Sequence, residues 1–539
     1  MRHRTMRPWL VVAGVTLAVI GQVGEWRSRL NGDAAYVLDT AGRMAEGTRL
    51  YTDVVDLNPP FVFWLNVPVA VAAKAAGIPP AAALRIAVLL VIALGGWLTW
   101  RVLRAEWAAE RLSAIVLFAY VVTTLVLPLG YFGEREHLLL ALIFPYVVLV
   151  AFRSGVDVSP GLASAVGIAA GVGVLLKPPA ALLFLVLTAM VAARRRTARS
   201  LLLPETLAAG GVLGLGAMLV LVAAPGYLET VRAYGALYWE FSRRAPLAIA
   251  AGTVFPWTLW LALAVAGATA LTLRARSLAL ALALAGLALF AAVLVQGKGF
   301  GYHYLPAMGM AVTLLILLLL GEARQWTIGV AVRRVTAGAA LLLTAGVFLL
   351  PAAVRRAAGR SGIIEQEARV SAALVSMVPR GSGLTVLSSR LADAYPLAAE
   401  TGARLATRLP HLWFVDAAYP RADSAIVTPR HPDRMTGAEA ALFRMVGEDL
   451  GRQRPSMLLV RNPAPGELRA GDLAFDYLRY FCADPEFAAA ATEYRHLASA
   501  GGFDAYRRDE TAGSEPGRPC DSTDAMPMTA SNPFMLRGE

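Results

Sequence analysis

Long apolar runs dominate the first two thirds of the chain, and most have the length of a membrane-crossing helix. A bilayer core about 30 Å thick requires about 20 apolar residues per helix. The pattern predicts about 11 such helices, at 8–24, 81–101, 112–128, 138–152, 159–176, 179–193, 203–224, 254–273, 277–295, 305–321 and 335–351. The sequence therefore predicts an all-α, polytopic membrane domain over residues 1–351, embedded in a lipid bilayer.

The apolar stretch 60–76 does not fit as a further crossing. It follows Pro59-Pro60 and precedes the Gly/Pro-rich segment 77–80. Arginine favours the cytoplasmic side of membrane proteins, and a crossing here would place Arg101 and Arg104 opposite the other Arg-rich loops. We therefore expect a helix that lies at the outer interface; a re-entrant or spanning helix is the alternative.

The composition changes from about residue 352 onward, where the chain becomes polar and mixed. Short apolar runs predict strands at 383–388 and 456–460, and longer periodic runs predict helices at 436–450 and 485–499. An odd number of crossings places this part outside the cytoplasm. We expect an extracytoplasmic α/β domain over 352–510 and a disordered tail over 511–539, which is rich in Gly, Pro, Ser and Thr.

The composition agrees with a membrane protein and excludes several functions. The chain is 57% hydrophobic and carries a net charge of +12, which Arg-rich cytoplasmic loops explain without a nucleic-acid partner. The sequence has no GxxxxGK[ST] phosphate loop and no HExxH motif, which argues against an ATP-driven pump. Cys482 and Cys520 are the two cysteines, and the sequence leaves open whether they pair or stay free thiols.

Acidic residues cluster directly after the first predicted helix. Asp33 follows that helix, and a carboxylate at this place can accept the proton of an attacking hydroxyl. The alternative is a role in capping the next helix, because Asn31-Gly32-Asp33 is also a helix-start signal. Asp53 and Asp56 precede Asn58, where they could position an acceptor, bind a cation or only keep the loop soluble.

A second polar cluster lies between the third and fourth predicted helices. Glu134, Arg135, Glu136 and His137 are four consecutive ionisable residues at a membrane edge, where a buried charge is energetically costly. Two carboxylates and a histidine could hold a divalent cation or shape a substrate pocket. An Arg–carboxylate pair with a purely structural role is the alternative.

Cations at two further loops are candidates for binding a phosphate. Lysine occurs only at positions 74, 177 and 298, so Lys177 and Lys298 stand out in an Arg-rich chain. Lys298 belongs to a segment with alternating glycines that ends in His303 and Tyr304, and cations there would stabilise a phosphate leaving group. The alternative is an interfacial aromatic belt with a lysine that reaches toward water.

These motifs, in this order, resemble the GT-C superfamily, in particular the bacterial relatives of protein O-mannosyltransferases and the lipid A aminoarabinose transferase. The resemblance covers about the first 350 residues. It rests on Asp33, the stretch Tyr51–Pro60, Glu134–His137 and the segment His303-Tyr304-Leu305-Pro306. The family's lysine before Pro-Pro is Asn58 here, so its phosphate contact would have moved to Lys177 or Lys298.

The resemblance implies a GT-C type glycosyltransferase of the bacterial inner membrane. Its donor would be a sugar linked to polyprenyl phosphate, its acceptor a lipid, glycan or protein on the extracytoplasmic face, and Asp33 its candidate base. No cofactor is implied with certainty. Two rival functions are a flippase or transporter of lipid-linked saccharides and an envelope polysaccharide ligase. Transporters tend to contain inverted repeats, and we find no repeat here.

Overall fold

The structure is a computed structural model with two compact units. Contacts within the chain group Met1–Gly235 with Ser242–Glu365, and Ala236–Phe241 with Gln366–Glu539. The domains predicted at 1–351 and 352–510 stay a prediction. The described residues are 8–105, 110–128, 130–153, 158–252, 254–269, 276–321, 328–357, 372–395, 397–419, 426–427, 429–462, 474–509 and 518–520.

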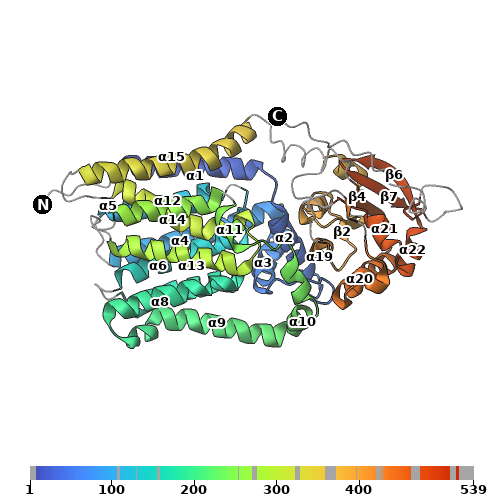
Figure 1. Ribbon diagram of the computed structural model, residues 1–539, viewed down its shortest axis with the longest axis horizontal. Helices are drawn as coiled ribbons and strands as arrows, with labels where there is room; N and C mark the ends of the chain where they lie inside the picture. The colour runs from blue at the N-terminus through green and yellow to red at the C-terminus, as the bar shows by residue number, and fades with distance from the viewer. Residues whose placement is uncertain are drawn as a thin grey trace. The chain divides into compact units, whose positions relative to one another are not determined.

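The first unit is a bundle of α-helices (Figure 1). A π-helix, η1 (Val122–Val126), follows α5, and a 3-10 helix, η5 (Gly301–Tyr304), precedes α14. The last residues of α10 group with the second unit. The helices are α1 (Pro8–Arg27), α2 (Gly32–Ala45), α3 (Phe61–Ala76), α4 (Pro80–Ala105), α5 (Glu110–Val121), α6 (Arg135–Phe152), α7 (Pro160–Leu176), α8 (Leu182–Arg195), α9 (Pro204–Ala223), α10 (Pro225–Glu240), α11 (Pro246–Ala251), α12 (Val254–Thr269), α13 (Arg276–Gln296), α14 (Leu305–Leu320) and α15 (Ile328–Ala357).

The protein is a multi-pass membrane protein. Within the described residues, seven helical segments are long and apolar enough to cross a membrane: Trp9–Arg27, Pro80–Ala105, Arg135–Phe152, Pro178–Arg195, Pro204–Ala223, Arg276–Gln296 and Gly301–Leu320. Each of the 11 predicted membrane segments contains a helix, and the stretch 60–76 forms α3. The number of crossings and the interfacial position of α3 stay predictions.

Helices α6 and α14 form the core of the first unit. Nearly all of their residues are buried, as expected for helices that are apolar on every side. Helix α6 packs against α4, α7 and α13, and α14 packs against α12, α13 and α15. A side chain at Gly95 of α4 would collide with the Ala141 carbonyl of α6, so this glycine permits the close approach of the two helices.

The second unit contains a five-stranded mixed sheet with the order β2-β1-β4-β7-β6. Strand β1 pairs in parallel with β2 and β4, whereas β7 pairs antiparallel with β4 and β6. A separate parallel pair joins β3 to β5. The strands are β1 (Gly383–Leu387), β2 (Arg404–Leu405), β3 (Ile426–Val427), β4 (Met457–Arg461), β5 (Ala474–Phe475), β6 (Tyr494–Ala500) and β7 (Phe503–Arg508).

Short helices connect these strands. The longest, α20, packs against α22. Helix α20 fits the helix predicted at 436–450, and β1 and β4 fit the two predicted strands. The helices are α17 (Leu391–Ala394), α18 (Leu397–Thr401), α19 (Trp413–Ala418), α20 (Gly437–Gln453), α21 (Tyr477–Phe481) and α22 (Pro485–Ala491).

The helix predicted at 485–499 is wrong in its second half. Helix α22 ends at Ala491, and the following residues form strand β6. Gly501 and Gly502 both have positive φ, which suits the two central residues of a tight hairpin turn between β6 and β7. The Gly-Gly pair is a hairpin signal that the helical pattern of 485–499 obscured.

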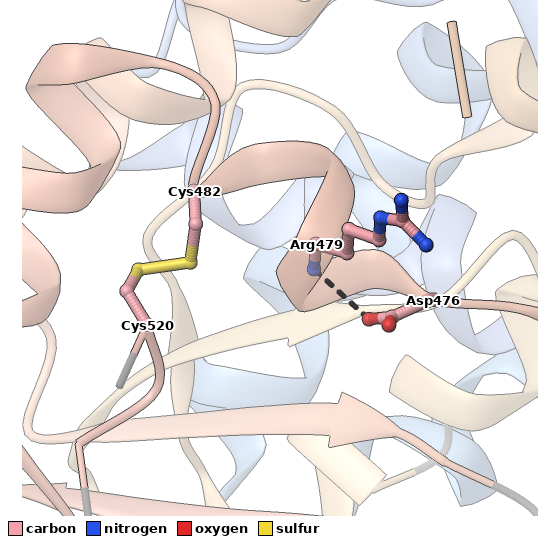
Figure 2. Close-up of a disulfide and its surroundings, with 4 residues drawn as sticks. All are labelled: Asp476, Arg479, Cys482 and Cys520. Atoms are coloured by element: carbon pink, nitrogen blue, oxygen red, sulfur yellow. Dashed lines mark hydrogen bonds between the residues drawn. A yellow bond between two sulfur atoms is a disulfide. The ribbon is translucent and has the colours of Figure 1, made fainter. Parts of the chain in front are cut away.

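A disulfide joins Cys482 to Cys520 in the second unit (Figure 2). It lies just after α21, where Asp476 accepts a hydrogen bond from the Arg479 amide and caps the helix. Of the two alternatives, a disulfide or two free thiols, the structure therefore contains the disulfide. Of the tail predicted to be disordered, Arg518–Cys520 is described, and 511–517 and 521–539 lie outside the described residues.

Candidate active site

A cavity lies where the N-terminal ends of α2 and α6 meet α3 and α4. The empty space there is about 400 Å³, open solvent included. Its lining combines apolar side chains with two carboxylates and a guanidinium group. The lining residues are Asp33, Ala34, Tyr36, Val37, Asn58, Val62, Asn66, Leu84, Gly133, Glu134 and Arg135.

Asp33 stands in the first turn of α2 and faces this cavity. The helix is capped by Asn31, whose side chain accepts a hydrogen bond of 2.8 Å from the Ala34 amide. Asp33 itself makes no hydrogen bond or ion pair with any described residue. Burial raises the pKa of Asp33 above its usual range, and Arg135 and Lys177 oppose this rise. The carboxylate is therefore available to a ligand.

A hydrogen-bonded chain shapes the loop beside Asp33. The buried Asp56 carboxylate accepts from the Tyr36 hydroxyl at 2.6 Å and from the Asn58 amide at 2.5 Å. The Asn58 carbonyl accepts from Tyr51 at 2.7 Å, and its side-chain oxygen accepts from Arg135. Burial raises the pKa of Asp56. Asp56 thus holds the loop, while Asn58 and Arg135 reach the cavity.

Glu134 supplies the second carboxylate of the cavity. Its side chain is 6% exposed and has no hydrogen bond or ion pair within the described parts of the chain. Burial raises the pKa of Glu134 well above its usual range, and the neighbouring Asp33 raises it further. A buried carboxylate without a partner is unfavourable for folding, so its retention points to a ligand.

A second, smaller cavity lies next to the first, and its polar lining consists of Glu136, Lys177, Gln296 and His303. Lys177 Nζ lies 2.5 Å from Glu136 Oε1, and His303 Nε2 lies 3.8 Å from the same oxygen. His303 Nδ1 is buried and has no hydrogen-bond partner among the described residues. Burial lowers the pKa of Lys177, and Glu136 opposes this shift.

The loop 297–304 brings one further cation near these groups. Lys298 is buried, and this burial lowers its pKa to about 7, with Lys177 and Arg135 adding to the shift. Tyr304 has a different environment, because its hydroxyl donates to the Ile249 carbonyl and its ring stacks on Phe255. Neither residue lines the two cavities described above.

Two other sequence candidates lie outside the cavities. Asp53 is exposed and accepts hydrogen bonds from Arg49, which lower the pKa of its carboxyl. His137 is fully buried; its Nδ1 accepts from the Gly133 amide at 3.1 Å, and its Nε2 lies 2.8 Å from the Thr124 carbonyl. The structure therefore brings Asp33, Asn58, Glu134 and Arg135 together, and places Asp53 and His137 elsewhere.

Sequence reasoning missed several residues that line the two cavities. Asn66 is the one polar residue in the middle of the apolar helix α3, and that isolation was its available signal. Gln296 ends α13, where a terminal polar residue gives no hint of a buried role. Within the described residues, no group of three or more His, Cys, Asp or Glu side chains is arranged to hold a metal ion.

Comparisons of sequence and of structure give different results. No protein-family model and no curated protein matches the sequence. Two crystal structures of ArnT from Cupriavidus metallidurans match 94% of this chain and 99% of their own, with 15% identical residues. The TM-score is 0.52 for the apo state and 0.50 for the complex with undecaprenyl phosphate. This chain has a GT-C fold.

The cryo-EM structure of the arabinofuranosyltransferase AftD from Mycobacteria also matches 94% of this chain. It does so over 40% of its own length, with 17% identity and a TM-score of 0.47. The two ArnT structures confirm the expected resemblance to GT-C glycosyltransferases at the level of the fold. The match to ArnT extends beyond the 350 residues on which the sequence resemblance rested.

Proposed function

We propose that this chain is a glycosyltransferase that moves a sugar from a polyprenyl-phosphate-linked donor to an acceptor hydroxyl. The observation that carries the proposal is that two carboxylates, Asp33 and Glu134, line one cavity and make no side-chain hydrogen bond or ion pair with a described residue. The GT-C fold supports it, since one ArnT structure with this fold contains undecaprenyl phosphate. The identities of the sugar and the acceptor are left open by this proposal.

Asp33 acts as the general base in this reaction. It takes the proton of the acceptor hydroxyl while the acceptor oxygen forms a bond to the anomeric carbon of the sugar. The bond from that carbon to the phosphate oxygen breaks, and its electron pair leaves with the polyprenyl phosphate. Attack from the side opposite the phosphate inverts the configuration of the anomeric carbon.

Glu134 remains protonated while Asp33 is ionised. Two carboxyl groups in one buried cavity disfavour double ionisation, and the pKa of Glu134 is raised well above its usual range by burial and by Asp33. A protonated Glu134 can donate a hydrogen bond to a sugar oxygen. Arg135 and Lys177 lower the pKa of both carboxyl groups, but after burial the largest influence on Asp33 is the Arg135 cation, whereas for Glu134 it is the negative charge of Asp33.

Lys177 and Lys298 stabilise the leaving phosphate, with Arg135 beside them. Negative charge develops on the phosphate oxygen as the bond breaks, and buried cations are most effective when such charge appears. Lys177 is held by Glu136 at 2.5 Å, and His303 Nε2 lies 3.8 Å from the same carboxylate oxygen. The ion pair keeps Lys177 charged and in place before the donor arrives.

The proposed site opens to the extracytoplasmic face of the inner membrane, as the arginine distribution predicts. The second unit lies on the same side and contributes to recognition of the acceptor. Its disulfide is compatible with an oxidising compartment. An alkaline phosphatase fused after Glu539 should be active, and an inactive fusion would contradict this orientation.

Mass spectrometry of envelope lipids and glycans tests the proposed activity. Cells that lack the protein should lose one glycosylated product, and the wild-type gene should restore it. A gene with Asp33→Asn should not restore it, although the variant should accumulate in the membrane at the wild-type level. Unchanged glycans combined with faster transbilayer movement of a lipid-linked saccharide would support a flippase and overturn the proposal.

A further inference from the structure

The start of helix α6 has no side-chain cap. Glu134 occupies the N-cap position, with the extended backbone (φ −69°, ψ 161°) typical of that position. A short polar side chain there, such as Ser, Thr, Asn or Asp, accepts a hydrogen bond from an amide of the first turn and stabilises the helix. The Glu134 side chain makes no such bond. Its carboxylate lines the cavity that contains Asp33.

His137 reaches back over this turn. It is the third residue of α6, the position from which a Glu or Gln bonds the N-cap amide in a capping box, but here the bond goes to the residue before the N-cap. His137 Nδ1 accepts a hydrogen bond of 3.1 Å from the amide of Gly133. Gly133 has φ +84°, a conformation that L side chains rarely adopt, so the turn before Glu134 is fixed both by the glycine and by this bond.

The second ring nitrogen of His137 connects the turn to the preceding helix. Because Nδ1 accepts a hydrogen bond, the proton of the neutral ring is on Nε2, which donates to the Thr124 carbonyl at 2.8 Å. Thr124 belongs to the π-helix η1, and a π-helix shifts the hydrogen-bond pattern of the helix in which it occurs. Both nitrogens of this buried ring are therefore satisfied.

We propose that His137 is a positioning residue that fixes the turn before α6 and thereby holds the Glu134 carboxylate toward the cavity. The imidazole bridges Thr124 and Gly133, and Glu134 is the next residue after Gly133. Its effect on the reaction passes through Glu134, because His137 lines neither cavity. This inference rests on the proposed glycosyltransferase function.

Two substitutions of His137 separate its hydrogen bonds from its volume. His137→Phe keeps a buried ring but removes both nitrogens, whereas His137→Asn keeps an acceptor close to the place of Nδ1. The probe is a panel of polyprenyl-phosphate-linked hexoses and pentoses, with release of polyprenyl phosphate as the readout. We expect His137→Phe to lower kcat by about 10- to 100-fold with little change in KM for the lipid, and His137→Asn to restore most of kcat.

The decisive comparison repeats His137→Phe in a protein that already carries Glu134→Gln. If His137 acts through Glu134, the second substitution should lower kcat by less than about twofold in that background. If His137→Phe lowers kcat by the same factor in the wild-type and the Glu134→Gln proteins, through misfolding or otherwise, the proposal is overturned. A His137→Phe protein with wild-type kcat would also overturn it.

Hydrogen exchange tests the same inference without turnover. The peptide that contains Gly133 should exchange faster in His137→Phe than in the wild type, and His137→Asn should retain most of the protection. Equal exchange in all three proteins would contradict the positioning role of His137. If the wild-type protein cleaves no donor in the panel but the three proteins still differ in exchange as expected, only the proposed function is contradicted.

Discussion

The buried acids of helix α20 and the carboxylates of the α2–α6 cavity have opposite surroundings. In the second unit, Glu439 and Asp449 lie on α20 and are almost completely buried. Arg430 pairs with Glu439 at 3.1 Å, and Arg408 pairs with Asp449 at 2.7 Å. In the first unit, the carboxylates of the α2–α6 cavity have no such partners among the described residues.

The difference does not reflect the membrane location alone. Glu205 of α9 is also buried in the first unit, and both of its oxygens accept from Arg153 at 2.8 Å. Each of these three buried acids, Glu439, Asp449 and Glu205, therefore carries a guanidinium partner. A carboxylate enclosed in a cavity without any partner is unfavourable for stability, and we attribute the retention of Glu134, and of Asp33 on the same cavity, to chemistry.

The largest effect expected concerns Asp33. Replacement by Asn removes the base and keeps the size of the side chain, so kcat should fall by about 10²- to 10⁴-fold. The thermal unfolding temperature of the purified protein should not fall, since Asp33 stabilises no partner. Turnover of the donor panel and differential scanning fluorimetry measure the two quantities.

A matched control for Asp33→Asn lies at the other end of the same helix. Glu46 is exposed, and its pair with Lys74 is a surface ion pair of small energetic value. Glu46→Gln should leave kcat and stability near the wild-type values. If Glu46→Gln and Asp33→Asn lowered kcat equally, the assignment of the base would be wrong.

The second prediction contrasts two glutamates of the first unit. Glu205→Gln leaves the buried Arg153 without its charge partner, which should lower the free energy of unfolding by about 3–5 kcal/mol. Glu134→Gln removes a partnerless buried acid, so it should leave stability unchanged or raise it while lowering kcat. Thermal unfolding in detergent measures both. A larger loss of stability in Glu134→Gln would show that Glu134 has a structural role.

The third prediction concerns pH. Turnover should rise with pH as Asp33, whose pKa burial raises, loses its proton and becomes a base. It should fall again above about pH 7 as Lys298, whose pKa burial lowers to about 7, loses its charge. Lys298→Arg should keep the charge at high pH and abolish this decline, because arginine stays protonated. A decline that persists in Lys298→Arg would exclude Lys298 as its cause.

The long apolar helices of the first unit were predictable because apolar length is a strong local signal, whereas α2, α10 and α11 were not predicted. Each predicted membrane segment contains a helix, and helix α3 begins at Phe61, directly after the two prolines. Strand β6 was missed because Ala- and Glu-rich sequence favours helix locally, and pairing with β7 overrides that preference.

The charged members of the site were predictable from the sequence, but Asn66, Gln296 and the separate role of each side chain were not. Glu134–His137 was recognisable as one polar cluster, and in the structure its four side chains have four different surroundings. Glu134 faces the first cavity, Arg135 contacts Asn58, Glu136 pairs with Lys177, and His137 accepts from the Gly133 amide. These directions depend on the packing of α6 against its neighbours, which no local pattern contains.

A cryo-EM structure with a polyprenyl-phosphonate sugar, which cannot be cleaved, tests the central claim most directly. The account predicts that the sugar occupies the cavity beside Asp33 and Glu134. It also predicts that the phosphonate lies against Lys177 and Lys298. A sugar bound elsewhere, with both carboxylates still facing an empty cavity, would contradict it.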